Sequence, residues 1–194
     1  MYYIFTFVIF VYHDISKGGA IRSHSTDTYI SNSSFSYNSA VIIANDNITT
    51  AHGGAIFFLK ANPDLKSEII ISETIFESNN APGRGGAIYS DFLKEKNSTT
   101  VDNITIINTL FNGNFIGPNI SNSACCPYAG QALAVDFGGI LTLKNVNMTG
   151  QYTVLDIINL SWWNSTSLSA AGDEPDVAEI VIVNSDIPGM STYT

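Results

Sequence analysis

The chain has 194 residues, of which 45% are hydrophobic and 13% are charged. This composition excludes an intrinsically disordered chain and is enough for one sizeable core. Acidic residues outnumber basic ones by 17 to 8, and the formal charge of −9 repels phosphate backbones and anionic lipid surfaces. We therefore expect no nucleic-acid partner. The abundance of Asn, Ser, Thr, Gly and Ile favours many short strands joined by turns.

An apolar segment, residues 1–17, opens the chain. Its first twelve residues, MYYIFTFVIFVY, suit the core of a signal peptide and are too few for a transmembrane helix. However, no basic residue precedes the run and no small-x-small cleavage site follows it. The alternative is a buried strand from a truncated upstream turn of a solenoid. Both interpretations stay open, and contact with a membrane is expected only through this segment or through parts outside the chain.

Residues 18–194 are predicted to form one repeat domain, because two short motifs recur there in alternation. The first motif is G-G-A-I, and its glycine pairs are Gly18 and Gly19, Gly53 and Gly54, and Gly85 and Gly86. The second motif is F-x-x-N, which begins at Phe35, Phe76 and Phe111 and ends at Asn38, Asn79 and Asn114. Glycine pairs permit sharp turns of the backbone.

A longer pattern, [I/L]-x-[N/E]-x-x-[F/M/I]-x-x-[N/Q/M], matches five segments of the chain. Its apolar anchors are Phe35, Phe76, Phe111, Met148 and Ile187, at intervals of 41, 35, 37 and 39 residues. The pattern predicts an all-β fold, a single-stranded parallel β-helix of about five imperfect turns. Each turn then lies about 4.8 Å from the turn before, so equivalent residues form columns. The anchors would fill the interior, and the column of Asn38, Asn79 and Asn114 would satisfy its hydrogen bonds between turns.

The alternating GGA[I/L/V] and FxxN motifs resemble the repeats of the chlamydial polymorphic outer membrane proteins and related microbial surface proteins. The resemblance covers residues 18–151 well, including the stretch NNAPGRGGAI, and residues 152–194 only by the anchor pattern. It implies a right-handed parallel β-helix that is displayed on a cell surface and adheres to host or neighbouring cells. It implies no catalytic residues.

The expected function is therefore a non-enzymatic adhesion, interaction or spacer module, with a protein or glycan of a host or neighbouring cell as its partner. The alternative is a polysaccharide lyase or glycoside hydrolase, since such enzymes also use parallel β-helices. An enzyme needs clustered carboxylates or a positioned base. The one dense acidic group, Asp173, Glu174 and Asp176, lies in the loop-like sequence SAAGDEPD. We expect no enzyme, no metal and no cofactor.

Three basic or titratable residues stand directly before the glycine pairs: Lys17, His52 and Arg84. Stacking would align them into a strip that could bind an acidic glycan. The alternative is that each points into water at a turn, and this interpretation is favoured. Trp162 and Trp163 could stack on sugar rings, although adjacent aromatic residues in a strand usually place one ring in the core.

Eight N-x-S/T sequons favour a location outside the cytosol, either extracellular or on the cell surface. The candidate N-glycosylation sites are Asn32, Asn47, Asn97, Asn103, Asn119, Asn147, Asn159 and Asn164. An Asn-rich bacterial surface protein would show the same matches without glycans. Cys125 and Cys126 are adjacent, so they cannot join distant parts of the chain, and no role is assigned to them.

Overall fold

The computed structural model describes twelve stretches of the chain, and all secondary structure in them is β. The stretches are residues 2–6, 9–11, 14–15, 18–24, 27–41, 51–59, 66–91, 102–117, 132–136, 139–150, 158–161 and 179–187. Their strands form four sheets in which every pairing is parallel. Among these residues there is no helix with the length and apolar character needed to cross a membrane.

Each sheet takes one strand from each successive turn of the chain. Sheet 1 contains β1 (Tyr2–Thr6), β5 (Asp27–Ser31), β9 (Glu68–Ser72), β13 (Asp102–Ile107), β17 (Gly139–Lys144) and β20 (Glu179–Val183). Sheet 2 contains β2 (Ile9–Val11), β6 (Ser34–Ser36), β10 (Ile75–Glu77), β14 (Leu110–Asn112) and β18 (Asn147–Thr149). Sheet 3 contains β3 (Asp14–Ile15), β7 (Ser39–Ala40), β11 (Asn80–Ala81) and β15 (Phe115–Ile116). Sheet 4 contains β4 (Ile21–His24), β8 (Ile56–Leu59), β12 (Ile88–Asp91), β16 (Leu133–Asp136) and β19 (Ile158–Ser161).

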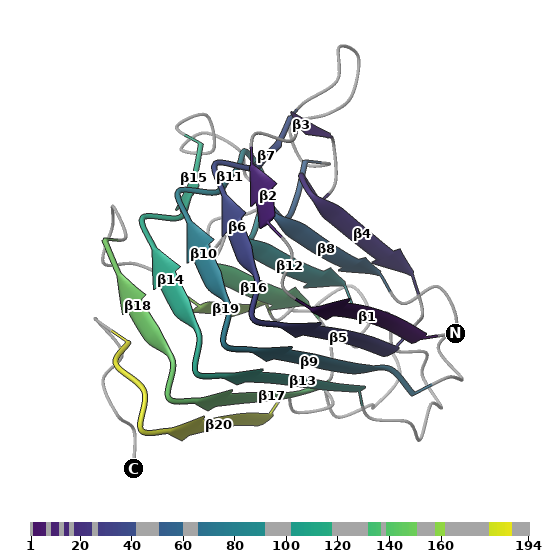
Figure 1. The fold of residues 1–194 in the computed structure, drawn as a ribbon, viewed down its shortest axis with the longest axis vertical. Coiled ribbons are helices and arrows are strands. Elements are labelled where there is room, and N and C mark those ends of the chain that lie inside the picture. The colour runs from purple at the N-terminus through teal and green to yellow at the C-terminus, as the bar shows by residue number, and fades with distance from the viewer. Residues whose placement is uncertain are drawn as a thin grey trace, which may run out of the picture.

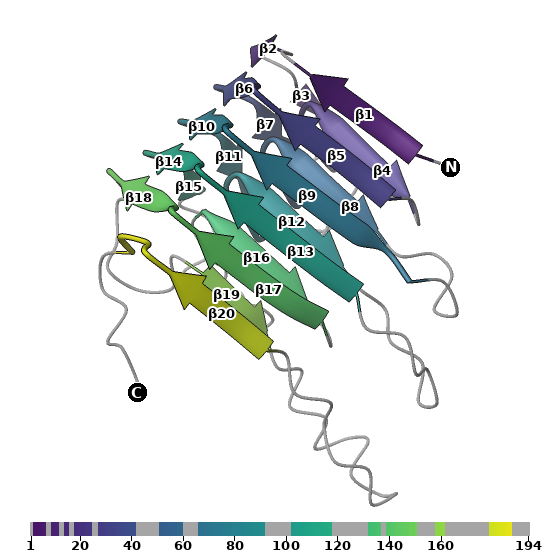
Figure 2. The same cartoon turned by 60° about the horizontal axis from the view of Figure 1, so that its bottom comes forward.

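The chain visits sheets 1, 2, 3 and 4 in that order and then begins again, which makes a parallel β-helix (Figure 1). Figure 2 shows the strands of sheet 1 stacked side by side, with sheet 4 behind them. The predicted fold class is therefore confirmed. The described strands make four passes through all four sheets, and a fifth pass, from β17 to β19, that has strands in sheets 1, 2 and 4.

The first pass begins before the first F-x-x-N motif and ends with the first G-G-A-I motif, whose Ile21 opens β4. The strand β1 pairs with β5, β2 pairs with β6, and β3 pairs with β7, and in this register Phe10 is the neighbour of Phe35. The strands of residues 2–15 therefore occupy the first rung of sheets 1 to 3. A strand of a solenoid turn was one of the two interpretations of this apolar run, and the F-x-x-N motif does not identify it because residue 13 is His where the later turns have Asn.

The core lies inside the coil, where alternate residues point inward in the strands whose side chains are described. In β9 the inward positions are Ile69 and Ile71, which are 1% and 0% exposed, whereas the other three residues, Glu68, Ile70 and Ser72, are half-buried. Branched aliphatic side chains suit such a pleated, half-buried surface. The largest apolar cluster runs continuously from Ile21 to Met148 and includes the inward residues of sheets 1, 2 and 4.

The bend between sheets 1 and 2 depends on a residue in the left-handed conformation. The residues at this corner have φ between 47° and 52° in five successive turns: Asn32, Glu73, Asn108, Asn145 and Asn184. Asparagine tolerates this region better than most residues, which explains why four of the five are asparagine. These are the [N/E] positions of the repeat pattern, for which the sequence had suggested no role.

Candidate functional site: stacked columns and outward faces

The aromatic anchors lie directly above one another inside the coil. Phe76 is the register neighbour of both Phe35 and Phe111. The ring centroids of Phe35 and Phe76 are 5.0 Å apart with an interplanar angle of 7°, and those of Phe76 and Phe111 are 4.9 Å apart at 10°. Met148 continues the column and is fully buried, as all three rings are, while Ile187 is partly buried against the core.

The buried column of Asn38, Asn79 and Asn114 forms a continuous hydrogen-bond ladder. Asn38 donates from its backbone N and from Nδ2 to Asn79 Oδ1, both at 3.0 Å. Asn79 donates to Asn114 Oδ1 in the same way, at 3.1 and 2.9 Å. All three side chains are 0% exposed, so each bond forms where water cannot replace it.

Two of these asparagines also donate hydrogen bonds to the backbone of the phenylalanine in the turn before. Asn79 Nδ2 donates to the carbonyl of Phe35, and Asn114 Nδ2 donates to the carbonyl of Phe76, each at 2.9 Å. The Asn79 amide thus uses its oxygen toward the turn before it and its nitrogen toward both neighbouring turns. This ladder fixes how far each turn is shifted along the strand relative to the next.

The glycine pairs lie at the entry to sheet 4, where neighbouring backbone atoms leave no room for a Cβ. Gly18, Gly53 and Gly85 have φ of 68°, 66° and 62°. A Cβ added to Gly53 would approach the carbonyl oxygen of Ile56 to 2.1 Å, and one added to Gly54 would approach that of Gly86 to 2.0 Å. Both positions therefore exclude every other residue, the first by conformation and contact and the second by contact alone.

The cationic positions before the glycine pairs are only partly described. Lys17 lies outside the described residues. His52 and Arg84 lie on adjacent rungs, since Gly18 N bonds to His52 O and Gly53 N bonds to Arg84 O. Arg84 is 8% exposed, and the half-buried His52 ring contacts the ring of Tyr89 at 4.6 Å between centroids. Because Arg84 is buried, little of its side chain is accessible to a ligand. The glycan-binding strip stays a prediction.

Three of the eight sequon asparagines have described side chains. Asn32 and Asn147 are exposed, and Asn103 is half-buried in β13. Asn159 lies in β19, where its side chain is outside the described residues, and Asn47, Asn97, Asn119 and Asn164 also lie outside them. The acidic group, the cysteine pair and the tryptophan pair also lie outside the described residues. These are Asp173, Glu174 and Asp176, Cys125 and Cys126, and Trp162 and Trp163.

A second polar column lies next to the left-handed corner and was missed by the sequence reasoning. Each hydroxyl in this column bonds to the backbone carbonyl two residues earlier. Ser33 bonds to Ser31, Thr74 to Ser72, Thr109 to Ile107 and Ser185 to Val183, at 2.7 to 3.0 Å. The sequence could have revealed this column at the residue that directly follows the [N/E] position of the pattern. That residue is Ser or Thr in four turns and Val146 in the other.

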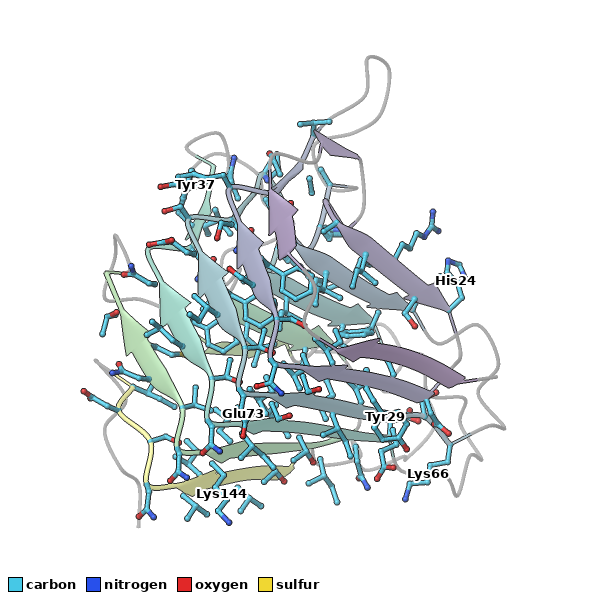
Figure 3. The ribbon with its side chains drawn as sticks, in the orientation of Figure 1. His24, Tyr29, Tyr37, Lys66, Glu73 and Lys144 are labelled. Atoms are coloured by element: carbon cyan, nitrogen blue, oxygen red, sulfur yellow. The ribbon has the colours of Figure 1, made fainter. Side chains whose placement is uncertain are left out.

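The outward faces of the sheets differ in what they offer to a partner. On sheet 4 the outward residues Phe57, Tyr89 and Ala134 are at most 4% exposed, and Phe57 and Tyr89 stack at 5.4 Å between centroids. On sheet 2 Ile75 is 43% exposed, and Tyr37, which directly follows β6, is 49% exposed. Figure 3 labels Tyr37 at the corner between β6 and β7. Sheet 2 is therefore the more accessible face.

Polar side chains on the outer surface form hydrogen bonds between neighbouring turns. Tyr29 Oη donates to Glu68 Oε2 at 3.0 Å, and the backbone N of Glu68 donates to Asp27 Oδ1 at 2.9 Å. On sheet 2, Asn112 Nδ2 donates to Glu77 Oε1 at 3.2 Å. Within the described ranges, no group of three or more His, Cys, Asp or Glu side chains is arranged to hold a metal ion.

Comparison with known proteins gives one match. The family model of the Chlamydia polymorphic membrane protein repeat matches residues 73–91. This segment runs from the left-handed corner at Glu73 through β10 and β11 to the end of β12, and it contains Phe76, Asn79 and the pair Gly85 and Gly86. The resemblance recognised from the motifs is thereby confirmed for this turn. No curated protein and no solved structure matches the chain.

Proposed function

We propose that the chain is a non-enzymatic module displayed outside the cell, where it adheres to a protein or glycan of a host or neighbouring cell. The observation that carries the proposal is the match of residues 73–91 to a repeat of Chlamydia membrane proteins, on a turn that has every structural column. The repeated residues supply stacking, hydrogen bonds within the coil and tight turns. The repeat therefore specifies a rigid scaffold and leaves its outward residues to vary.

The outward face of sheet 2 is the proposed contact surface. It combines the exposed isoleucine Ile75 and the polar side chains of Ser36, Glu77 and Asn112 with the exposed Tyr37 of the adjoining corner. Tyrosine is enriched at protein interfaces because it offers a large contact area and a hydroxyl at a low cost in conformational entropy. The strands beneath are held in register by the ladder of Asn38, Asn79 and Asn114, so the surface is preorganised for binding.

A cell-binding assay tests this proposal. Fluorescently labelled chain is applied to a panel of cells, and the double variant Tyr37→Ser with Ile75→Asp is compared with Val183→Asp. The control residue is similarly exposed, at 39%, but belongs to sheet 1. We expect saturable binding that the double variant lowers at least tenfold and the control preserves. Absence of binding to every cell type would contradict adhesion, and equal loss in both variants would contradict sheet 2 as the surface.

The same purified chain should be incubated with acidic polysaccharides while reducing ends and unsaturated uronates are measured. We expect no product above the level of the boiled protein. Turnover that survives purification to homogeneity would support the carbohydrate-active alternative and overturn the non-enzymatic proposal.

A further inference from the structure

The outward face of sheet 2 lies between two corners that carry no insertion in the described turns. Each corner is formed by two residues. The corners are residues 32–33, 73–74, 108–109 and 145–146 before sheet 2, and residues 37–38, 78–79 and 113–114 after it. The connections into and out of sheet 4 vary in length instead, and the one before β20 takes up residues 162–178. A partner that lies along sheet 2 therefore meets a continuous strip of short strands (Figure 2).

An apolar centre lies in this face. Ile75 and Leu110 are register neighbours in β10 and β14, and their outward side chains form the middle of a column. Ser34 precedes them in this column, and Asn147 and Asp186 follow them. Ile75 is 43% exposed and Leu110 is half-buried, so both are accessible to a partner. Covering them releases water from apolar surface and so favours binding.

Acidic side chains surround the apolar centre. In the turn of Ile75, Glu73 lies at the corner before it and Glu77 lies on the outward face after it, and Asp186 lies at the far end of the column. Glu73 and Asp186 are exposed, whereas Glu77 is half-buried and its Oε1 accepts from Asn112 Nδ2 at 3.2 Å. The described residues of sheet 2 and its two corners include no Lys, Arg or His.

The charge of this face distinguishes between partners. A sulfated or carboxylated glycan and an anionic membrane are both repelled by it, whereas lysine and arginine side chains are attracted. The exposed Lys144 ends β17 in sheet 1, next to the corner residue Asn145, and Figure 3 labels it together with Glu73. Even when Lys144 is included, three acidic groups outnumber one basic group. The partner that fits is therefore basic as well as apolar.

We propose that the outward face of sheet 2 binds a protein segment in which apolar residues are flanked by lysine or arginine. This inference rests on the proposed adhesion and names the chemistry of its partner. Ile75 and Leu110 contact the apolar residues, and the three acidic side chains pair with the basic ones. The hydrogen bond from Asn112 holds Glu77 in place before binding, so less conformational freedom is lost when the partner arrives.

The probe for this proposal is a synthetic amphipathic peptide of leucine and lysine, whose binding to the purified chain is measured by isothermal titration calorimetry. The face variant is Glu73→Gln with Glu77→Gln. The matched control, Asp27→Asn with Glu68→Gln, removes the same charge from sheet 1 and keeps the oxygen acceptors that those two side chains use. A third variant, Ile75→Ser, removes apolar surface and keeps every charge. Circular dichroism checks that each variant folds.

We expect the unaltered chain to bind this peptide, and to bind neither a peptide of leucine and glutamate nor heparin. The face variant should bind about fivefold more weakly and the control within about twofold of the unaltered chain, because each exposed ion pair contributes little. Ile75→Ser should also weaken binding about fivefold. Raising NaCl from about 0.05 M to about 0.5 M should weaken binding of the unaltered chain more than that of the face variant, since salt screens exposed charges.

Three outcomes would overturn the proposal. The unaltered chain could fail to bind the peptide of leucine and lysine. The face variant and the control could lose affinity equally, which would indicate a general attraction to an acidic chain. Heparin could bind and be displaced by the peptide, which would indicate an acidic glycan as the partner. The cell assay separates this result from adhesion: peptide binding without cell binding contradicts adhesion alone, and cell binding without peptide binding contradicts the basic partner alone.

Discussion

Two columns of asparagine run along the coil, one inside it between sheets 2 and 3 and one outside it at the corner between sheets 1 and 2. The inner column, Asn38, Asn79 and Asn114, is fully buried, and its amide groups bond to one another and to backbone groups. The outer column, Asn32, Asn108, Asn145 and Asn184, is exposed and lies in the left-handed backbone region. The same residue type is therefore selected twice for different physical reasons.

The comparison shows which property of asparagine each position requires. The inner column requires the amide itself, because both its donor and its acceptor are used where no water can substitute. The outer column requires the backbone conformation, and Glu73 can replace asparagine there with φ of 50°. A side-chain bond does occur in the outer column, from Asn145 Nδ2 to Asn108 Oδ1 at 2.9 Å, but it is exposed and contributes little.

The largest effect is expected when the inner amide is removed. Asn79→Ala takes the acceptor from the backbone N and Nδ2 of Asn38 and leaves both donors buried. We expect the free energy of unfolding to fall by about 3 to 5 kcal/mol. Urea denaturation followed by circular dichroism measures this change. Asn79→Gly should cost at least as much, because backbone freedom cannot replace the amide, and a loss below about 1 kcal/mol would refute the assigned role.

An intermediate effect is expected at the outer column. Asn108→Ala puts a residue that disfavours the left-handed region at φ of 50°, and we expect a loss of about 1 kcal/mol. Asn108→Gly should restore stability to within about 0.5 kcal/mol, since glycine enters this region at no steric cost. The same denaturation experiment gives both values. If glycine proves as harmful as alanine, the amide of Asn108 matters more than its conformation, and the contrast between the two columns fails.

The sequence was sufficient to predict the fold class and the order of its turns. Regular spacing of Phe35, Phe76 and Phe111 predicts columns because a parallel coil brings equivalent residues of successive turns together, and in the structure these rings stack at 5.0 and 4.9 Å. Conversely, the number of sheets could not be deduced. The strands of sheet 3 have two residues each, which is too short for the alternating pattern by which strands are recognised.

The candidate site was less predictable than the fold. The pattern located the left-handed corner but could not assign its backbone conformation, since Asn also favours turns and caps for other reasons. Exposure was equally hard to foresee. Arg84 is a charged residue before a turn and would ordinarily face water, yet it is 8% exposed. The outward residues Phe57 and Tyr89 are buried in the same way, by tertiary packing that local sequence does not encode.

The smallest effect should come from correcting the one exception in the outer column. Glu73 lies between Asn32 and Asn108 at this corner, is exposed, and holds φ of 50° without the tolerance that asparagine has for this region. We expect Glu73→Asn to raise the free energy of unfolding by about 0.5 kcal/mol. The matched control is Glu77→Gln, which also removes one negative charge but leaves a β-strand residue in place. Thermal and urea midpoints should rise for Glu73→Asn and change less for Glu77→Gln. Equal gains in the two variants would mean that relief of charge repulsion, rather than of the left-handed conformation, accounts for the stabilisation.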